Sequence, residues 1–352
     1  MNIDPNNFYF GKKMFLTGHT GFKGSWLSLW LTMLGAKVVG FSLKADKESL
    51  FNSAEVATGL EESIIGDIRN FDEIAAAVKN FQPEIILHLA AQPLVRDSYF
   101  DPRKTYETNV IGTLNVFEAA RKAGSVRVIT NITTDKCYEN RETDYAYQEE
   151  DSLGGYDPYS SSKACAEILT SSYRRSFFQK EGIQLASARA GNVIGGGDFS
   201  VDRIIPDIFR AIRAGEKVKL RSPNSIRPWQ HVLEPLYGYL LLTKNLYEKG
   251  EDFAKACNFG PNKDAEKNVE ILTKTFIEKI GIGAYEIAAD ATLHEAGILK
   301  LNHSRATKEL NWQPKLSFEE TLEWTAEWYR NYLEKKVSAR EFTLSQIQNF
   351  IK

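Results

Sequence analysis

Short apolar runs alternate with segments of helical periodicity to about residue 195 of the chain. The runs that predict strands are KKMFLTG, KVVGFSL, SIIGDI, PEIILHLAA, RVITNITT and GIQLASARAGNVIG. The segments that predict helices are SWLSLWLTML, FDEIAAAVKNF, residues 101–123 and residues 157–181. Both of the last two begin with Asp-Pro, which supplies an N-cap and a proline in the first turn. A strand–helix alternation of this kind predicts a doubly wound α/β fold, with a parallel sheet covered by helices on both faces.

Beyond about residue 195 the pattern becomes irregular, and GGGDFS, RSPNSIRPW and GPNKDAEKN are loop signals. No linker or repeat separates the two parts. We therefore expect a large domain over residues 1–190 that also receives a segment near 232–260. Residues 191–231 and 261–352 are expected to form a smaller mixed α/β domain packed on the sheet, with a cleft between the two.

Charge and cysteine content exclude several classes of protein. The 352 residues carry a net charge of −2 without a basic run, which argues against a nucleic-acid or membrane partner. Cys137, Cys165 and Cys257 are widely spaced and form no C-x-x-C motif, as is typical of a reduced compartment. No apolar run approaches the ~18 residues of a membrane span, and the N-terminus lacks a signal core. The expectation is a soluble cytoplasmic protein.

The segment TGHTGFKG follows the first predicted strand and opens a helix. Its glycines, Gly18, Gly21 and Gly24, let the backbone approach a pyrophosphate at the helix N-terminus. A glycine pattern alone is a weak signal, but this position in a βαβ series predicts dinucleotide binding. The side chains of His19 and Lys23 either lie near the phosphates and neutralise them, or point to solvent, which is the expectation for Lys23.

The G-x-x-G-x-x-G spacing resembles the extended short-chain dehydrogenase/reductase family, which implies a Rossmann-type fold and bound NAD. The second strand ends with Ser42 and Lys44 where an acidic residue is expected. A lysine there could favour a 2′-phosphate, so NADP stays open. The residues that the resemblance places at the cofactor are Gly18, His19, Gly21, Phe22, Lys23, Gly24, Ser42, Asp67, Ile68, Ala90, Ala91 and Gln92, with Tyr159 and Lys163 from the motif below.

The motif YSSSK places Tyr159 and Lys163 one helical turn apart. A nearby ammonium stabilises a phenolate and lowers the pKa of the tyrosine. The alternative is an ordinary amphipathic pair, but in the family the catalytic pair opens the helix after the fifth strand. Thr134 falls at the family's catalytic hydroxyl. Together these residues imply hydride transfer at a secondary alcohol, with Tyr159 taking the proton.

The segment NITTDKCYEN adds an acid and a base, Asp135 and Lys136, directly after Thr134. Such a pair resembles the nucleotide-sugar 4,6-dehydratases, and TTDKCY with TGHTGFKGSW resembles the CDP-glucose 4,6-dehydratase family. The resemblance covers nearly the whole chain and fades over roughly the last 20 residues. It implies that Asp135 protonates the hydroxyl leaving carbon 6 and that Lys136 occupies the place of the carbon 5 base. A free lysine has a pKa of about 10.4, so Lys136 either has a lowered pKa or stays charged and stabilises the enolate.

Several arginines and one asparagine are candidates for the nucleotide sugar. The residues that the resemblance implies are Arg189, Asn192, Arg227, Arg305 and, for the sugar, Arg96. A guanidinium binds phosphate through two hydrogen bonds, although a lone arginine is more often a surface residue.

The histidines outside the glycine loop are expected to be structural. His88, inside the fourth strand, is expected in the core. His231, His294 and His303 have no metal-ligand spacing, so no metal site is predicted.

Three other functions stay open: a dehydratase of a dTDP-, UDP- or GDP-sugar, a 4-epimerase, and a non-catalytic dinucleotide sensor. Asp135 disfavours an epimerase, and intact Thr134, Tyr159 and Lys163 disfavour a sensor. The resemblance also implies a homodimer or dimer of dimers, paired through the helices at 101–123 and 158–181. It further implies a place in dideoxyhexose biosynthesis for lipopolysaccharide O-antigen.

Overall fold

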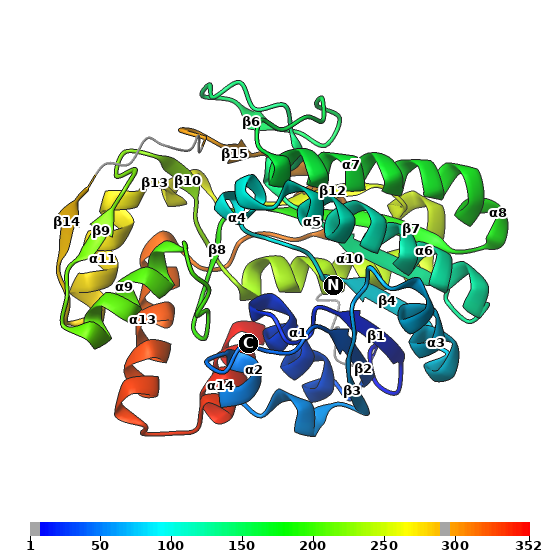
Figure 1. Cartoon of the computed structure of the whole chain (residues 1–352), viewed down its shortest axis with the longest axis horizontal. Coiled ribbons are helices and arrows are strands. Elements are labelled where there is room, and N and C mark those ends of the chain that lie inside the picture. Colours follow the sequence, from blue (N-terminus) through cyan, green and yellow to red (C-terminus); the bar gives the residue numbers. More distant parts are fainter. Residues whose placement is uncertain (1–7, 289–295) are drawn as a thin grey trace.

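Seven parallel strands form the central sheet of the computed structural model, which describes residues 8–288 and 296–352 (Figure 1). They are β1 (Lys13–Thr17), β2 (Lys37–Ser42), β3 (Glu62–Ile65), β4 (Ile85–His88), β5 (Val128–Ile132), β7 (Gln184–Ala190) and β12 (Ala256–Phe259). Their order is β12-β7-β5-β4-β1-β2-β3, and every pairing is parallel. The order reverses between β1 and β4, where an open α/β sheet forms a crevice at the carboxyl ends of its strands. The predicted doubly wound α/β fold is confirmed.

The strands are apolar on both faces because helices cover both faces. Along β1, Leu16 joins a core that contains Trp26 and Trp30, whereas Phe15 joins a second core with Phe117. The first face is covered by α1 (Phe22–Met33) and α10 (Leu233–Lys249). The opposite face is covered by α3 (Phe71–Phe81), α6 (Gly112–Ala123) and α7 (Pro158–Tyr173).

The two helices predicted after Asp-Pro begin as expected, but each contains a π-helical turn. Asp101 caps α5 (Pro102–Tyr106), which continues through η3 (Glu107–Ile111) into α6 and ends at Gly124. Asp157 caps α7, which continues through η5 (Arg174–Phe178) into α8 (Gln179–Glu181). Single π turns occur frequently at functional sites. Here the turn η3 carries Asn109, which bonds the backbone of Gln92 and the hydroxyl of Ser162.

The remaining elements form smaller units around the sheet. They are α2 (Leu50–Ser53), η2 (Val56–Gly59), α4 (Val95–Phe100), η4 (Asp135–Cys137), β6 (Ala146–Tyr147), β8 (Val193–Ile194), α9 (Ile204–Ala214), β9 (Val218–Leu220), β10 (Ile226–Pro228), β11 (Gln230–His231), η6 (Gly250–Phe253), η7 (Lys263–Ala265), β13 (Glu266–Asn268), α11 (Val269–Ile280), β14 (Tyr285–Ile287), β15 (Lys300–Leu301), α12 (Ser304–Leu310), α13 (Phe318–Glu334) and α14 (Ala339–Ile351). Figure 1 shows α9, α11 and α13 gathered beside β9 and β14, away from α3 and α6. The late elements α10 and β12 return to the sheet, while the division into domains stays a prediction.

The last helix, for which the sequence indicated no role, packs against the first. Ser338 and Glu341 form a capping box that starts α14. Its Phe350 ring lies edge-on to Trp30 of α1, with ring centroids 6.0 Å apart, and its Thr343 hydroxyl accepts a hydrogen bond from the Trp328 indole. Helix α14 therefore closes the core on one face of the sheet. Within the described ranges, no helix has the length and apolar content needed to cross a membrane.

Candidate active site

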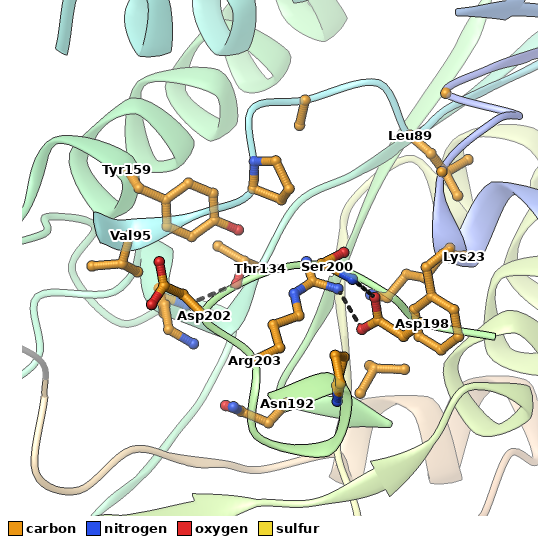
Figure 2. Close-up of a pocket in the computed structure, with 18 of the residues that line it drawn as sticks. Lys23, Leu89, Val95, Thr134, Tyr159, Asn192, Asp198, Ser200, Asp202 and Arg203 are labelled. Atoms are coloured by element: carbon orange, nitrogen blue, oxygen red, sulfur yellow. Dashed lines mark hydrogen bonds and ion pairs between the residues drawn. The ribbon is translucent and has the colours of Figure 1, made fainter. Parts of the chain in front are cut away.

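A cavity of about 550 Å³ opens at the carboxyl ends of the sheet strands. One wall comes from the loops after β1, β2, β3, β4 and β5, and the other from residues 191–207 and 219–229. Of the predicted residues, the cavity is lined by Gly18, Gly21, Phe22, Lys23, Gly24, Ser42, Asp67, Ile68, Ala90, Ala91, Thr134, Lys136, Tyr159, Lys163, Asn192 and Arg227. Figure 2 shows Tyr159 at the left of the cavity and Lys23 at the right, with Thr134 between them in this view. The fold therefore brings most of the predicted site together, and the individual roles stay predictions.

The glycine loop is built for close backbone contact. Gly18 has a φ of +77°, and a Cβ there would lie 2.7 Å from the Ala90 nitrogen. A Cβ on Gly24 would lie 2.0 Å from the carbonyl oxygen of Gly18. Gly21 caps helix α1, whose first residues line the cavity. Tight glycines at the N-terminus of a helix after β1 form the cradle that a pyrophosphate needs, so the residues present fit a dinucleotide.

The glycine loop allows a matched test of this packing. In Gly24→Ala the new methyl group meets the Gly18 carbonyl, so we expect the free energy of unfolding to fall by about 1–3 kcal/mol. In Gly21→Ala the nearest atom is the same oxygen at 3.4 Å, and the stability should change little. Urea unfolding of the cofactor-free protein measures both. Equal unfolding midpoints for the two variants would show that the loop is not tightly packed.

Of the predicted residues beside the cofactor loop, Ser42 and Asp67 line the crevice and Lys44 does not. The Ser42 hydroxyl lies 2.8 Å from that of Thr20, and both line the cavity. The Asp67 carboxylate accepts two hydrogen bonds from the Arg69 guanidinium, at 2.9 and 2.6 Å, and these bonds lower the pKa of Asp67. Lys44, the residue because of which NADP was kept as a possible cofactor, is exposed and does not line the cavity.

Two cofactor predictions are wrong for the side chains concerned. The His19 ring is fully buried away from the cavity, with Nε2 2.7 Å from the Ser63 hydroxyl of β3. Burial lowers the pKa of His19 to about 4, so the imidazole is neutral at pH 7 and cannot offset a phosphate charge. The Gln92 side chain also turns away, donating to Leu94 O and the Thr105 hydroxyl, and it does not line the cavity.

Lys23 also differs from expectation, because it points into the cavity and not to solvent. It follows Phe22 in the first turn of α1, and its ammonium donates to the Tyr239 hydroxyl of α10 at 3.3 Å. Its burial, and the positive charges nearby, lower the pKa of Lys23 to about 7.

The acid and base after Thr134 start a short 3₁₀ turn, η4, at the end of β5. Asp135 is fully buried, and its Oδ1 accepts a hydrogen bond of 3.0 Å from the Thr134 hydroxyl. The Lys136 ammonium lies 3.7 Å from the same oxygen and reaches the cavity. The other carboxylate oxygen, Oδ2, is buried without a hydrogen-bond partner among the described residues. Burying a polar atom without a partner costs free energy.

Tyr159 and Lys163 lie on the first turns of α7, beside Thr134. The Tyr159 backbone N–H donates to the Ser98 hydroxyl of α4, which fixes the start of the helix. Both side chains are buried. Burial raises the pKa of Tyr159 well above its usual range, and the hydrogen bond with Thr134 opposes this only in part. Burial also lowers the pKa of Lys163 to about 8. The predicted lowering of the tyrosine pKa is therefore wrong for the chain without its ligands, because desolvation outweighs the lowering by the Thr134 hydrogen bond and the Arg203 charge.

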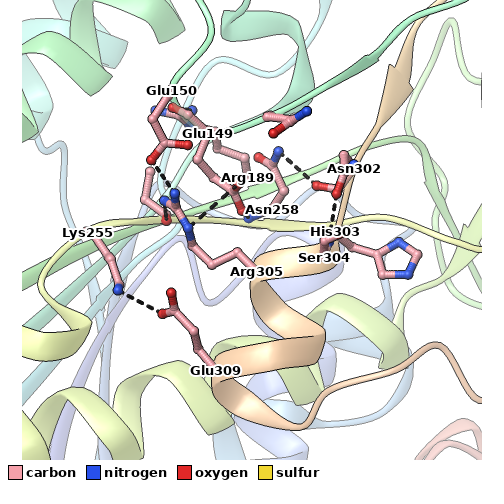
Figure 3. Close-up of polar contacts among 12 residues, drawn as sticks. Glu149, Glu150, Arg189, Lys255, Asn258, Asn302, His303, Ser304, Arg305 and Glu309 are labelled. Atoms are coloured by element: carbon pink, nitrogen blue, oxygen red, sulfur yellow. Dashed lines mark hydrogen bonds and ion pairs between the residues drawn. The ribbon is translucent and has the colours of Figure 1, made fainter.

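Two of the predicted substrate arginines serve the interior of the protein. The Arg189 guanidinium is buried and pairs with Glu167 at 2.7 Å, and it donates to the Tyr138 hydroxyl at 2.8 Å. Figure 3 shows Arg305 directed toward Glu149 and Glu150, and it also donates to Ala256 O at 3.0 Å. Neither arginine lines the cavity, so both predictions are wrong. In each case the guanidinium forms an ion pair with a carboxylate from another segment of the chain.

Arg96 and His88 both lie outside the lining of the cavity. Arg96 does not line the cavity, and it pairs at 3.9 Å with Asp202, which does. His88 is buried between the hydroxyls of Thr17 and Thr113, at 2.7 and 3.0 Å, which confirms its expected place in the core. His294 lies outside the described residues. Among the described residues, no group of His, Cys, Asp or Glu side chains could hold a metal ion.

The sequence did not single out two residues that act electrostatically on the site, Arg203 in the cavity and Tyr239 buried beside it. Arg203 lines the cavity and pairs with Asp198 at 3.0 Å, and its charge opposes the rise in the pKa of Tyr159. Tyr239 is fully buried in α10, close enough to Tyr159 and Asp135 for their charges to affect its own pKa. An arginine just before a helix after GGGDFS was a usable signal for Arg203. Nothing in the local sequence separates Tyr239 from the other apolar residues of α10.

Comparison with known proteins gives consistent matches over most of the chain. A family model described as GDP-mannose 4,6 dehydratase matches residues 15–325. The curated CDP-glucose 4,6-dehydratase of Salmonella typhimurium is 47% identical over 334 residues, which are 93% of each chain. The dTDP-glucose 4,6-dehydratase of the same organism is 25% identical over 349 residues, 90% of this chain and 92% of the relative.

Solved structures share the fold at lower identity. A dTDP-glucose 4,6-dehydratase from Streptomyces venezuelae, with NAD and TYD bound, superposes with a TM-score of 0.79. It is 23% identical, and the match covers 92% of this chain and 98% of that chain. The epimerase Mth375 from Methanothermobacter thermautotrophicus has a TM-score of 0.81 at 22% identity, covering 95% and 96% of the two chains.

Proposed function

Because the chain belongs to the GDP-mannose 4,6 dehydratase family, we propose that it is an NAD-dependent hydro-lyase that converts CDP-glucose to CDP-4-dehydro-6-deoxyglucose and water. The relative with 47% identity over 93% of the chain, a CDP-glucose 4,6-dehydratase, supports the choice of nucleotide. The observation that carries the chemistry is that Thr134 and Lys136 line one cavity with Tyr159 and Lys163. Asp135 is buried behind them, hydrogen-bonded to the Thr134 hydroxyl and 3.7 Å from the Lys136 ammonium.

Tyr159, Thr134 and Lys163 serve the oxidation at carbon 4 of the sugar. Accepting a hydride from carbon 4 and returning it to carbon 6 is the chemistry that bound NAD supplies. The residues that would hold it line the crevice around Gly18, Gly24, Ser42 and Asp67. Tyr159 takes the proton of the carbon 4 hydroxyl, and the Thr134 hydroxyl orients the same oxygen. We assign to Lys163, which is also buried and lies one helical turn further along α7, the stabilisation of the phenolate that Tyr159 must form.

Asp135 and Lys136 serve the elimination across carbons 5 and 6. Oxidation at carbon 4 acidifies the proton on carbon 5, and we assign its removal to Lys136. Asp135 donates a proton to the hydroxyl that leaves carbon 6 as water. Its Oδ2 has no hydrogen-bond partner among the described residues, so no protein group competes with a substrate hydroxyl for that oxygen. A 4-epimerase needs no such acid, so the buried Asp135 favours dehydration.

Replacing Lys136 by Met tests the assignment of the base. With the preformed 4-keto sugar, the rate at which solvent deuterium enters carbon 5 should fall by about 10²-fold or more, because the amine is lost. The measurement is NMR or mass spectrometry of the recovered sugar. Undiminished exchange would rule Lys136 out as the base and leave it the alternative role of stabilising the enolate by its charge.

Incubation with four substrates tests the function as a whole. The protein is supplied with NAD and CDP-, dTDP-, UDP- or GDP-linked sugars, and the base-labile absorbance of a 4-keto product is followed. We expect product from CDP-glucose at the highest kcat/KM. No product from CDP-glucose, or faster conversion of another nucleotide sugar, would overturn the proposed substrate.

We also propose a homo-oligomer, a dimer or a dimer of dimers, in the cytoplasm. Large apolar side chains are exposed on the outer helices that follow β4 and β5, namely Phe100, Ile111 and Ile168. Exposed apolar groups on adjacent helices favour association. Light scattering should give at least twice the chain mass of 39.8 kDa. We further propose that the 4-keto product is used by later enzymes that make dideoxyhexoses for surface polysaccharide.

A further inference from the structure

A buried hydrogen-bond network lies behind η4, the acid–base turn that carries Asp135 and Lys136. Tyr138 caps the C-terminal end of this turn and is fully buried. Its hydroxyl donates to Asn258 Oδ1 of β12 at 2.7 Å and accepts a hydrogen bond of 2.8 Å from the Arg189 guanidinium of β7. Arg189 and Asn258 are paired across these two neighbouring strands (Figure 3). The phenol hydroxyl therefore attaches the end of the turn to the central sheet.

The direction of both bonds at this hydroxyl is determined by its partners. The Asn258 side-chain nitrogen donates to the carbonyl oxygens of Tyr147 and Asn302, at 3.0 and 3.2 Å, so its Oδ1 remains as an acceptor. The Arg189 guanidinium can only donate. Burial raises the pKa of Tyr138 well above its usual range, so the phenol keeps the proton that it donates to Asn258. The hydroxyl therefore has a single orientation.

Arg189 connects the same network to the helix of the tyrosine–lysine pair. Glu167 lies on α7 one turn beyond Lys163, and it pairs with Nη2 of the guanidinium at 2.7 Å. Nη1 of the same guanidinium bonds the Tyr138 hydroxyl. A guanidinium is planar and rigid, so the two groups that it bonds keep a constant separation. Arg189 therefore sets how far the acid–base turn lies from the helix that carries Tyr159 and Lys163.

The two ends of the acid–base turn are attached to β7 in different ways. Before the turn, the Thr133 backbone N–H donates to Ala188 O of β7 at 2.9 Å. After the turn, the backbone on both sides of Tyr138 bonds the loop at residues 152–154, at 2.9 and 3.0 Å, and this loop lies outside the central sheet. The bond from Arg189 to Tyr138 is therefore a side-chain link between β7 and the end of the turn.

The same strand leads into the wall beside the Asp135 carboxylate. Gly191 follows the end of β7, two residues after Arg189. A Cβ there would lie 3.1 Å from Asp135 Oδ2 and 2.8 Å from Cγ of Pro228, so the wall is close on this side. A catalytic side chain must be held within roughly 0.5 Å of its productive position. A shift of the acid–base turn relative to β7 therefore changes the position from which Asp135 gives up its proton.

We propose that Tyr138 is a positioning residue for the dehydration step. Its hydroxyl, held between Arg189 and Asn258, fixes the acid–base turn against β7. The turn in this position presents Asp135 and Lys136 to carbons 6 and 5 of the sugar. Tyr138 does not line the cavity, so it acts through these two residues and not on the substrate. The proposal rests on the proposed function and adds a residue that this function needs.

Tyr138→Phe tests this role, because it removes the hydroxyl and keeps the ring. With CDP-glucose and saturating NAD, oxidation at carbon 4 should stay within about threefold of wild type, because α7 keeps Tyr159 and Lys163 in place. Formation of the 4-keto product should fall roughly tenfold or more, because a small displacement of a catalytic group is costly. Stopped-flow absorbance should show that reduced nicotinamide accumulates, and rapid quench measures the product. An unchanged rate of product formation, or equal slowing of the two steps, would overturn the proposal.

Tyr147→Phe is the matched control. The Tyr147 ring stacks on that of Tyr138, with ring centroids 5.2 Å apart, and it is also buried. Its hydroxyl bonds Arg141 N at 2.8 Å and Asn140 Oδ1 at 3.3 Å, and neither partner belongs to the acid–base turn or to β7. Both variants should lower the midpoint of urea unfolding, but only Tyr138→Phe should accumulate reduced nicotinamide. Accumulation in both variants would make Tyr138 a structural residue and contradict the proposal.

Arg189→Lys tests the same link in case Tyr138→Phe does not fold. The ammonium keeps a positive charge beside Glu167 but puts one nitrogen in place of the two that bond Glu167 and Tyr138. We expect slower product formation and accumulation of reduced nicotinamide in this variant as well. Product formation at the wild-type rate would rule out the proposed role of the link.

Failure of this proposal is distinguishable from failure of the proposed function. If wild-type protein forms no product from CDP-glucose, the proposed function fails, and the role of Tyr138 fails with it. If wild type turns over and the Tyr138 and Arg189 variants accumulate no reduced nicotinamide, only the role of Tyr138 fails.

Discussion

Replacing Tyr159 by Phe is expected to lower kcat for CDP-glucose by about 10²–10⁴-fold while the protein stays folded. The phenol is the group proposed to accept the proton from the carbon 4 hydroxyl, and the ring alone preserves the packing at the start of α7. The bond from the Tyr159 backbone N–H to Ser98 is untouched by the substitution. Steady-state product formation at saturating NAD measures the loss. Thermal unfolding checks that the fold is retained.

Asp135→Asn is the matched control for this variant. The amide removes the acid proposed to release water but leaves Tyr159 and Lys163 in place. We expect oxidation at carbon 4 to continue, so the ultraviolet absorbance of reduced nicotinamide should accumulate in Asp135→Asn and not in Tyr159→Phe. If both variants accumulated the reduced cofactor, Tyr159 would not be the group that takes the carbon 4 proton.

Replacing Arg189 by Met is expected to lower the free energy of unfolding by about 3–5 kcal/mol. Only 4% of the arginine side chain and 3% of Glu167 are exposed, so the substitution leaves a buried carboxylate without its countercharge. Glu167 then keeps hydrogen bonds only from neutral donors, the hydroxyls of Thr133, just after β5, and Ser187 in β7. Urea unfolding measures the change. Activity should fall as well, because Thr133 adjoins Thr134.

Two controls distinguish the two possible causes of this loss of stability. One cause is a buried charge left without a partner, and the other is the loss of an ion pair in itself. The double variant Glu167→Gln, Arg189→Met removes both charges and should recover much of the lost stability. Arg103 pairs with Glu107 at 2.7 Å, the same distance, but 87% of its side chain is exposed. Arg103→Met should therefore leave the unfolding midpoint unchanged, because solvent screens exposed pairs. A similar loss in Arg103→Met and Arg189→Met would contradict the argument from burial.

The sequence alone was sufficient for the fold and for the main catalytic motifs. Strand and helix periods are properties of neighbouring residues, and Asp-Pro and glycine signals act within a few positions. The same holds for Tyr159 and Lys163, since residues four apart on a helix share a face. The π turns inside the two long helices were not predictable, because they depend on side chains such as Asn109 that bond other segments.

The direction of single side chains depended on partners far along the chain. The Arg189 side chain is directed inward because its guanidinium donates a hydrogen bond to the carboxylate of Glu167, 22 residues earlier. The Arg305 guanidinium likewise donates to Glu150, 155 residues earlier. His19 bonded Ser63 of a neighbouring strand, where a phosphate partner had been expected. Each of these side chains has a chemistry that could bind a ligand. In the folded protein, however, each forms a hydrogen bond with another protein residue.

The acid and the base after Thr134 show the same division between what the sequence and what the tertiary structure determined. Their order in the chain determined that they stand at the end of β5, beside the tyrosine–lysine pair. Only the tertiary structure decided that Asp135 is buried with one oxygen lacking a partner among the described residues, and that burial lowers the pKa of Lys23 as well as that of Lys163. The physical reason is that periodicity and turns are determined by residues close in the sequence. The desolvation of a side chain and the charges around it are determined by residues close in space. Lys23 meets Tyr239 across 216 residues of sequence, and no local pattern contains that contact.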